Sequence, residues 1–247
     1  MTTARPDHLH ISGTFNYRDV GGIRTAGGTT IRHGVLLRSA HLCRLDQAGH
    51  GTLRELDIAT VHDLRGPAEI ELLGADDLPE GVRLQLTPFH SEIGKQAPHE
   101  VVDRDGRQEM LQVYASFPTM PEAGVAIRGI AHSIARDDGA VLVHCAAGKD
   151  RTGWAVATLL RAVGVEESDV LADYLLSNGA VDSLRADVDY NSAGQTTLPP
   201  DVLGVLPEYL AAATESMQAG YGDLDGYLTA IGIGEQLRTQ LYERLLD

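Results

Sequence analysis

Residues Val141-Leu-Val-His-Cys-Ala-Ala-Gly-Lys-Asp-Arg-Thr-Gly153 decide both the fold and the chemistry of this chain. A β-branched apolar run leads to His144, Cys145 follows it, and Arg151 comes six residues after the cysteine. The apolar run predicts a buried strand over 140–144. Behind the arginine, apolar residues recur with helical spacing and a glycine follows them, which predicts a helix: Val156, Leu159, Leu160, Val163 and then Gly164.

The loop between this strand and this helix has the features of a phosphate site. Its successive backbone N–H groups can turn inward around an anion, and the start of the helix adds partial positive charge. The planar guanidinium of Arg151 matches two phosphate oxygens, and the same field favours the thiolate of Cys145 as a nucleophile. Gly148 permits a turn where a Cβ would clash, and the Thr152 hydroxyl can hydrogen-bond the sulfur. The residues expected to bind the substrate are Ala146, Ala147, Gly148, Lys149 and Arg151.

The sequence of this loop resembles that of a known family. His144-Cys-Ala-Ala-Gly-Lys-Asp-Arg-Thr-Gly153 is similar to the signature of the Cys-based protein tyrosine phosphatase superfamily, in its bacterial tyrosine and phosphoinositide phosphatase branch. Phe15-Asn-Tyr-Arg-Asp-Val-Gly-Gly22 is similar to the opening motif of that branch. Further landmarks at 34–40, 63–65 and 221–228 extend the resemblance from about residue 11 to residue 246.

The resemblance implies a phosphomonoester hydrolase that acts on phosphotyrosine through a phosphocysteine and needs no cofactor. Phosphoserine and phosphothreonine are further substrates to be expected, and the partner is a phosphorylated protein or a phosphoinositide. One alternative is a mainly phosphoinositide phosphatase, suggested by Lys149. The protein could alternatively be a non-catalytic phosphate-binding module, or an enzyme of sulfur transfer or arsenate reduction. The alternative for Cys145 itself is a structural role as a buried residue.

Two aspartates are candidates for the general acid that such a reaction needs. Asp150 is the first, by similarity to relatives with an aspartate before the loop arginine; its alternative role is to orient Arg151. Asp63 is the second, because it ends a predicted core strand; its alternative is a bond to Arg65 or to the backbone. His144 either tunes the thiolate or supports the loop.

Composition limits the remaining function classes. A formal net charge of −15 argues against nucleic acid and anionic membranes as partners. Apolar runs are too short for a membrane helix, and the first residues lack a signal-peptide core. Two cysteines, one of them needed as a free thiolate, indicate a reducing compartment, so we expect a cytoplasmic protein, with export without a signal peptide left open. Lys149 is one of only two lysines beside 18 arginines, which favours a role in the loop.

Cys43, three arginines and two histidines are the remaining candidates for a functional role. Cys43 is either a plain half-buried thiol or a partner for a reversible disulfide with Cys145. Arg18, Arg38 and Arg65 either extend the substrate site or form ordinary ion pairs. No metal is assigned, because His8 and His10 lack converging ligands.

Alternating strands and helices predict an α/β fold with a small, largely parallel central sheet flanked by helices, and a helical C-terminal region. We expect one domain over 1–247, in which about 165–220 forms a helical lid or a scaffold. An irregular loop is expected over 91–108. Outside the helix at Val156–Val163, helices are predicted over 46–56, 108–117, 122–135, 168–176, 180–188, 207–218, 224–231 and 235–246, and further strands over 59–64 and 83–87.

Overall fold

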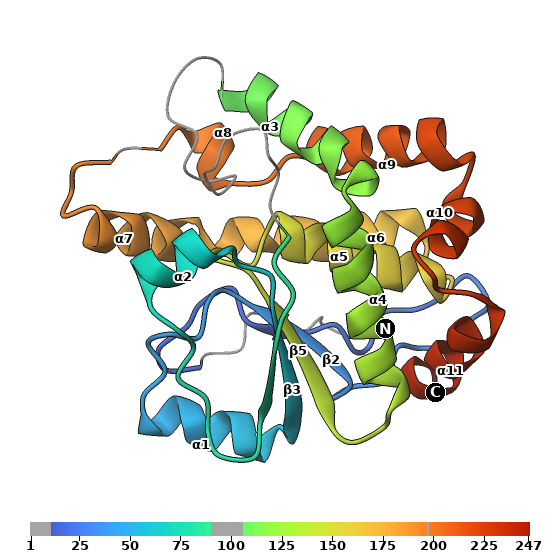
Figure 1. Ribbon diagram of the computed structural model, residues 1–247, viewed down its shortest axis with the longest axis horizontal. Coiled ribbons are helices and arrows are strands. Elements are labelled where there is room, and N and C mark those ends of the chain that lie inside the picture. Colours follow the sequence, from blue (N-terminus) through green and yellow to red (C-terminus); the bar gives the residue numbers. More distant parts are fainter. Residues whose placement is uncertain (1–10, 90–105, 197) are drawn as a thin grey trace.

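A five-stranded sheet forms the centre of the computed structural model, which describes residues 11–89, 106–196 and 198–247 (Figure 1). The strand order is β1-β2-β5-β3-β4; β2, β5, β3 and β4 run parallel, and β1 pairs antiparallel with β2. The predicted α/β fold with a largely parallel sheet is confirmed. The strands are β1 Arg18–Asp19, β2 Leu36–Ser39, β3 Ile58–Asp63, β4 Arg83–Leu86 and β5 Ala140–His144.

The helices agree with most of the predicted segments. They are α1 Gln47–Glu55, α2 Pro67–Leu73, α3 Gly106–Ser116, α4 Pro121–Ala135, α5 Arg151–Ala162, α6 Glu167–Leu175, α7 Val181–Asn191, α8 Pro200–Leu203, α9 Pro207–Tyr221, α10 Leu224–Ala230 and α11 Glu235–Leu245. The short helices α2 and α8 were not predicted. The loop expected over 91–108 lies mostly outside the described residues, and its last part, 106–108, is instead the first turn of α3.

The central strands are covered on both faces, which explains their continuous apolar runs. On one face, Leu37 of β2 and Leu142 of β5 pack in a cluster with Leu53 of α1. On the other face, Val141 and Val143 of β5 belong to a larger cluster that includes residues of α4 and α5. Figure 1 shows α1 on one side of the sheet and α4 and α5 on the other.

The register of the strands determines where a site can form. Ser39, His144 and Asp63 lie side by side at the ends of β2, β5 and β3. Residues that follow these strands therefore meet at one edge of the sheet, and α5 begins at the same edge. Among the described residues, no helix is both long enough and apolar enough to cross a membrane.

Candidate active site

The loop Cys145–Asp150 joins β5 to α5 and is buried throughout. The carbonyls of residues 146, 147 and 148 each accept a hydrogen bond from a distant residue: the His41 N–H at 3.1 Å, Asn16 Nδ2 at 3.0 Å and Arg38 Nη2 at 2.9 Å. The N–H groups of residues 146–149 donate to no other described residue. With its carbonyls fixed to the scaffold, the loop keeps its N–H groups available for an anion.

Gly148 is needed for this loop geometry. Its φ is +67°, in the region that favours glycine, and a Cβ built on it would lie 2.0 Å from the carbonyl oxygen of Ser39. The loop therefore lies directly against the end of β2.

Buried ion pairs hold the arginines that support the loop. Arg38 Nη1 donates to Asp173 Oδ2 at 2.8 Å, and Arg18 Nε donates to Asp173 Oδ1 at 2.9 Å. Arg18 also donates to the Asn16 side chain at 2.7 Å. Asn16 and Arg38, which bond the loop carbonyls, therefore belong to one network. Burial raises the pKa of Asp173, but the two guanidiniums outweigh it and hold that pKa below its ordinary value. Arg18 and Arg38 thus lie in ion pairs beneath the loop.

Arg151 is the first residue of α5, and its guanidinium is held from one side. Nη1 and Nη2 donate to the two carboxylate oxygens of Glu69, each at 2.6 Å, and Nη1 also reaches the Leu64 carbonyl at 3.2 Å. Burial lowers the pKa of Arg151, but Glu69 outweighs it and raises that pKa above its ordinary range. The Nε of Arg151 is buried and has no partner among the described residues. The next hydroxyl, Oγ1 of Thr152, is buried and equally without a described partner.

Asp150 and Lys149 form a pair at the end of the loop. Asp150 Oδ1 accepts from Lys149 Nζ at 2.9 Å and from the Tyr114 hydroxyl at 2.7 Å. Lys149 Nζ also reaches the Gly204 carbonyl, which follows α8, at 3.4 Å. The Tyr174 hydroxyl donates to the Tyr114 hydroxyl at 2.7 Å, and burial, with Asp150 next, raises the pKa of Tyr114 well above its usual value. Tyr114 therefore stays protonated and remains a donor to Asp150.

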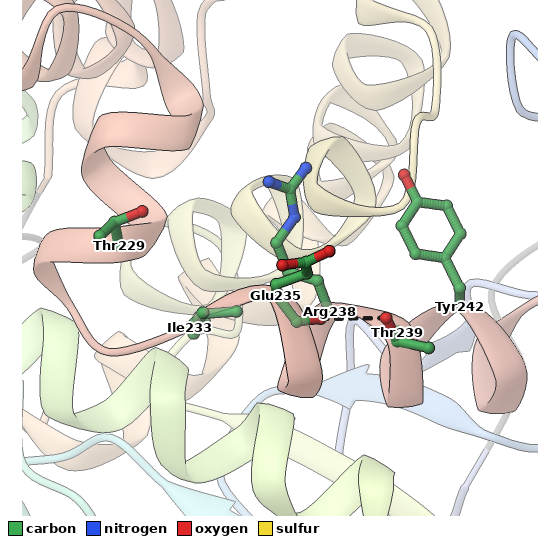
Figure 2. A pocket seen from close by; sticks show the side chains of 7 residues that line it. Thr229, Ile233, Glu235, Arg238, Thr239 and Tyr242 are labelled. Atoms are coloured by element: carbon green, nitrogen blue, oxygen red, sulfur yellow. Dashed lines mark hydrogen bonds between the residues drawn. The ribbon is translucent and has the colours of Figure 1, made fainter.

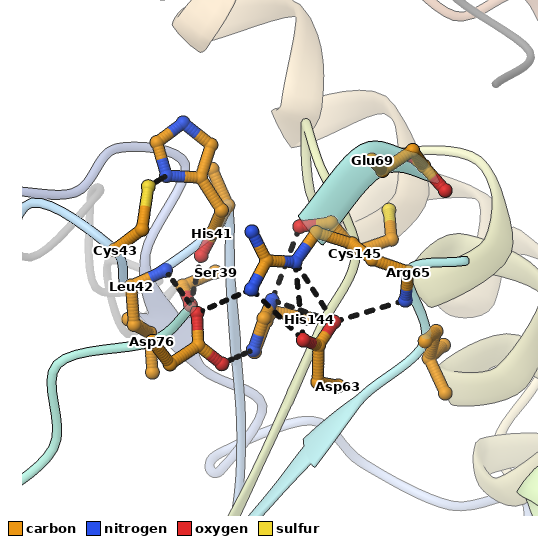
Figure 3. A network of polar contacts seen from close by, with 12 residues as sticks. Ser39, His41, Leu42, Cys43, Asp63, Arg65, Glu69, Asp76, His144 and Cys145 are labelled. Carbon is orange, nitrogen blue, oxygen red and sulfur yellow. Dashed lines mark hydrogen bonds and ion pairs between the residues drawn. The ribbon is translucent and has the colours of Figure 1, made fainter. Parts of the chain in front are cut away.

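Asp63 and His144 belong to a separate polar network under the loop (Figure 3). Both Asp63 oxygens bond the Arg65 guanidinium, and Arg65 Nη2 also donates to Asp76 Oδ1 at 2.8 Å. His144 Nε2 lies 2.7 Å from Asp76 Oδ2, and its Nδ1 lies 3.1 Å from the Cys145 carbonyl oxygen. Both partners are acceptors, so the ring needs both protons. Burial lowers the pKa of His144, but Asp76 and Asp63 outweigh it and raise that pKa.

In the described part of the chain, one group of side chains has the spacing of metal ligands, and it belongs to the same network. Asp63, Asp76 and His144 offer ligand atoms within 4.8 Å of one another. The guanidinium of Arg65 already bonds both carboxylates, and the imidazolium adds a second positive charge. A metal cation would have to displace these charges, so the donor set does not fit one. His8 and His10 lie outside the described residues.

The structure brings Cys145, Asp150, Arg151 and Thr152 together around one loop, whereas Asp63 and His144 lie beneath it. Sequence reasoning did not find the four side chains that hold this loop and its ends: Asn16, Glu69, Tyr114 and Asp173. Asn16 lies in the motif over 15–22, which indicates the family but not this role, and Glu69, Tyr114 and Asp173 lie in no local pattern that indicates one.

A hollow of about 430 Å³ lies by α10 and α11 (Figure 2). It is lined by Thr229, Ile233, Gly234, Glu235, Arg238, Thr239 and Tyr242. Its one arginine is ion-paired with Asp225 at 2.7 Å. No lining residue comes from the loop, so this hollow is not part of the site.

Comparisons with known proteins agree on one family. The family model described as "Tyrosine phosphatase family" matches residues 9–247. The chain is 36% identical to the triple specificity protein phosphatase PtpB of Mycobacterium tuberculosis, over 91% of this chain and 94% of that protein. It is 32% identical to a putative tyrosine-protein phosphatase of Cupriavidus necator, over 86% and 80% of the two chains. The solved structure of P. aeruginosa TpbA aligns with 19% identity and a TM-score of 0.38, covering 82% of this chain and 89% of that one, which is too distant to add to the assignment.

Proposed function

Because this chain belongs to the tyrosine phosphatase family and is a Cys-dependent phosphatase, we propose that it hydrolyses phosphotyrosine through a phosphocysteine on Cys145. The observation that carries this proposal is the set of unpaired donors around the loop. The N–H groups of residues 146–149, Nε of Arg151 and Oγ1 of Thr152 have no partner among the described residues. A phosphoryl group presents charged equatorial oxygens that need such donors.

The reaction proceeds in two steps. The thiolate of Cys145 attacks phosphorus, and the bond between phosphorus and the tyrosine oxygen breaks as that oxygen takes a proton. Water then attacks the phosphocysteine, loses a proton to a base, and releases phosphate and the thiolate. Arg151 stabilises the charge on the equatorial oxygens in both steps, and the Thr152 hydroxyl stabilises the departing sulfur.

Asp150 serves as the acid and then as the base. It stands at the end of the loop beside Arg151, and both of its described donors bond the same oxygen, Oδ1. That arrangement leaves Oδ2 to face the leaving group. Asp63, in contrast, is bound through both oxygens by Arg65, which supports a positioning role for it beneath the loop.

A second candidate substrate class is the phosphoinositides. Lys149 is a buried cation at the rim of the loop, and one relative carries the name of a triple specificity phosphatase. If Lys149 contacts a second phosphate, Lys149→Ala should impair hydrolysis of polyphosphorylated inositides far more than hydrolysis of a phosphotyrosine peptide. Equal losses on both would assign Lys149 to the general electrostatics of the loop.

The helices over 165–220 act as a scaffold within a single domain. Asp173 of α6 pairs with two arginines beneath the loop, so α6 cannot move away without exposing buried charges. One apolar cluster includes both Val20 and Leu245, which supports one domain over the whole chain. Both cysteines are free thiols, which supports a reducing, cytoplasmic setting.

A turnover panel tests the proposal. Purified enzyme is given phosphotyrosine, phosphoserine and phosphothreonine peptides and mono- and polyphosphorylated inositides, beside Cys145→Ser and Arg151→Lys forms. We expect phosphotyrosine to be hydrolysed and Cys145→Ser to be inactive but still able to bind the ester. We expect Arg151→Lys to be severely impaired, because an ammonium cannot bond both oxygens of Glu69 and also present an N–H edge to the phosphate. Cys43→Ser, which changes the other thiol, should keep its activity. If Cys145→Ser retains more than about a tenth of wild-type kcat, the phosphocysteine mechanism is wrong.

A further inference from the structure

A second cysteine in this chain lies in a group of titratable side chains outside the catalytic loop. Cys43 Sγ is 2.9 Å from Nδ1 of His41, and Nε2 of the same ring is 3.1 Å from Asp187 Oδ1 in α7. Figure 3 shows the sulfur of Cys43 directed at the His41 ring. Asp187 is fixed in turn by Arg44 Nη1 at 2.8 Å and by Asn191 Nδ2, which donates to its other oxygen at 3.1 Å.

This order of groups determines where the protons lie. The Asp187 carboxylate can only accept, so Nε2 of His41 carries a proton, and Nδ1 is the ring atom that hydrogen-bonds the sulfur. Burial lowers the pKa of His41, but its hydrogen bonds to Asp187 and Cys43 outweigh burial and raise that pKa to about 9. A thiol beside a histidine that a carboxylate orients is the arrangement that activates nucleophilic cysteines.

The other charges around the sulfur are those of its neighbours. Arg65 lies close enough to interact with Cys43 electrostatically, and Arg44 is the next residue in the chain. Asp76, which binds the Leu42 N–H, is the nearby carboxylate, and it is itself neutralised by Arg65 and His144. Arg65 is also paired with Asp63, and Arg44 with Asp187, so each carboxylate near the sulfur has a cationic partner although the chain as a whole carries −15.

Small molecules can reach this group. Cys43 is partly exposed, whereas Cys145 is only 2% exposed. A hollow of about 420 Å³ also adjoins the histidine side, where His41, Asp187, Phe15, Arg44 and Tyr190 are among its lining residues. Of the two thiols in the chain, Cys43 is thus the accessible one.

We propose that Cys43 is a hydroperoxide-reactive thiol, with His41 as its acid–base partner and Asp187 as the group that orients His41. The thiolate attacks the terminal oxygen of a hydroperoxide, the O–O bond breaks, and the sulfur becomes a sulfenic acid. Sulfur loses two electrons and the peroxide gains them. The alkoxide or hydroxide that departs takes the proton from Nδ1 of His41 and leaves as alcohol or water. A hydroperoxide fits because its leaving group is basic and needs this proton.

The test measures the rate of sulfenic acid formation by hydrogen peroxide, trapped with dimedone and read by mass spectrometry. Full-length Cys145→Ser protein provides a background with Cys43 as its one thiol. At pH 7 we expect the folded chain to react at least about tenfold faster than the same chain in concentrated urea, although the sulfur is less exposed in the folded chain. Cys43→Ser in the same background must remove the adduct.

Two variants test the assigned roles. His41→Gln should lower the rate about tenfold, and Asp187→Asn should lower it by a smaller factor, because the amide keeps the hydrogen bond but loses the charge. His50→Gln is the matched control, since His50 bonds the Asp77 carbonyl and should leave the rate unchanged. The proposal is overturned if the folded chain reacts no faster than the unfolded one. It is also overturned if both the His41 and Asp187 variants, shown to be folded by circular dichroism, react at the parental rate.

Discussion

The carboxylate of Glu69 binds both terminal nitrogens of Arg151, with each oxygen 2.6 Å from its nitrogen. Glu69 is itself fixed at the start of α2, where its Oε2 accepts the Gly66 N–H at 2.9 Å. The plane of the guanidinium is therefore set before any substrate arrives. Only the Nε edge of Arg151 remains without a described partner.

Glu69→Gln should misalign Arg151 while the bond to Gly66 persists, because the amide oxygen still accepts. We expect kcat/KM for a phosphotyrosine peptide to fall about 10–100-fold, the range for a misplaced catalytic group. The buried guanidinium would lose its counterion, so the free energy of unfolding should fall by about 3 kcal/mol. Glu71→Gln, an exposed glutamate of the same helix, is the control for steady-state kinetics and denaturant unfolding. Equal kcat/KM values for the two variants would remove Glu69 from the positioning of Arg151.

Asp150→Asn should slow the phosphorylation step with a tyrosine ester by about 10²–10⁴-fold, because the basic tyrosine oxygen needs a proton as it leaves. The same variant should be much less impaired with an activated nitrophenyl phosphate, whose leaving group departs unprotonated. The alkaline limb of its kcat/KM profile should weaken. Asp63→Asn is the comparison: if it shows this pattern of leaving groups and Asp150→Asn does not, the acid is Asp63.

Gly148→Ala should prevent the loop from closing against β2, because its Cβ would meet the Ser39 carbonyl at 2.0 Å. The variant also faces a positive φ, so we expect a loss of more than about 2 kcal/mol in stability together with loss of activity. Gly220→Ala in α9 is the control, since nothing lies within 4 Å of its added Cβ. It should be neutral or stabilise the helix by up to about 1 kcal/mol. Thermal unfolding and kcat measure both, and a fully active Gly148→Ala would contradict the loop geometry.

Stability should change with pH in opposite directions at two buried histidines. The folded-state pKa of His41 is raised from 6.5 to about 9. Its contribution to the free energy of unfolding is therefore complete below pH 6.5 and is lost as pH rises through 9. Burial, with Arg136 and His144 next, lowers the pKa of His62 from 6.5 to about 4, so its contribution is complete above pH 6.5 and is lost as pH falls through 4. Each shift corresponds to about 3 kcal/mol.

Urea unfolding between pH 4 and pH 9.5 measures these slopes. His41→Gln should flatten the alkaline side only, and His62→Gln should flatten the acidic side only. An alkaline slope that survives in His41→Gln would show that another group titrates there.

The elements with a strong local pattern were predicted correctly. The apolar run of β5 and the helical spacing of α5 fixed the loop between them, and Asp46 caps α1 as its sequence indicates, by accepting the Gly49 N–H. Helix α8 was missed because its four residues are too few to carry a recognisable period. Helix α2 has seven residues, as α10 does, but it begins after Gly66 and lacks a side-chain N-cap such as Asp223 of α10.

The supporting side chains of the site could not be predicted for a different reason. Tyr114 lies 36 residues from Asp150, and Glu69 lies 82 residues from Arg151. Each is an ordinary residue of its own helix, and only tertiary packing brings it to the loop. A local sequence pattern identifies catalytic residues when they are neighbours in the chain. It does not identify residues that are distant in the chain and position the catalytic ones through tertiary contacts.

The three bonds that anchor the loop carbonyls also order the events of folding. Asn16 and Ala147 are 131 residues apart, and Arg38 and Gly148 are 110 residues apart. Contacts between such distant segments carry a large loop-closure entropy and form late. We therefore expect the amide hydrogen of His41, which donates to the Ala146 carbonyl, to be among the last to gain protection from solvent exchange during refolding. A partly folded chain would have no anion nest, and the ability to hold a phosphate would mark a completed fold.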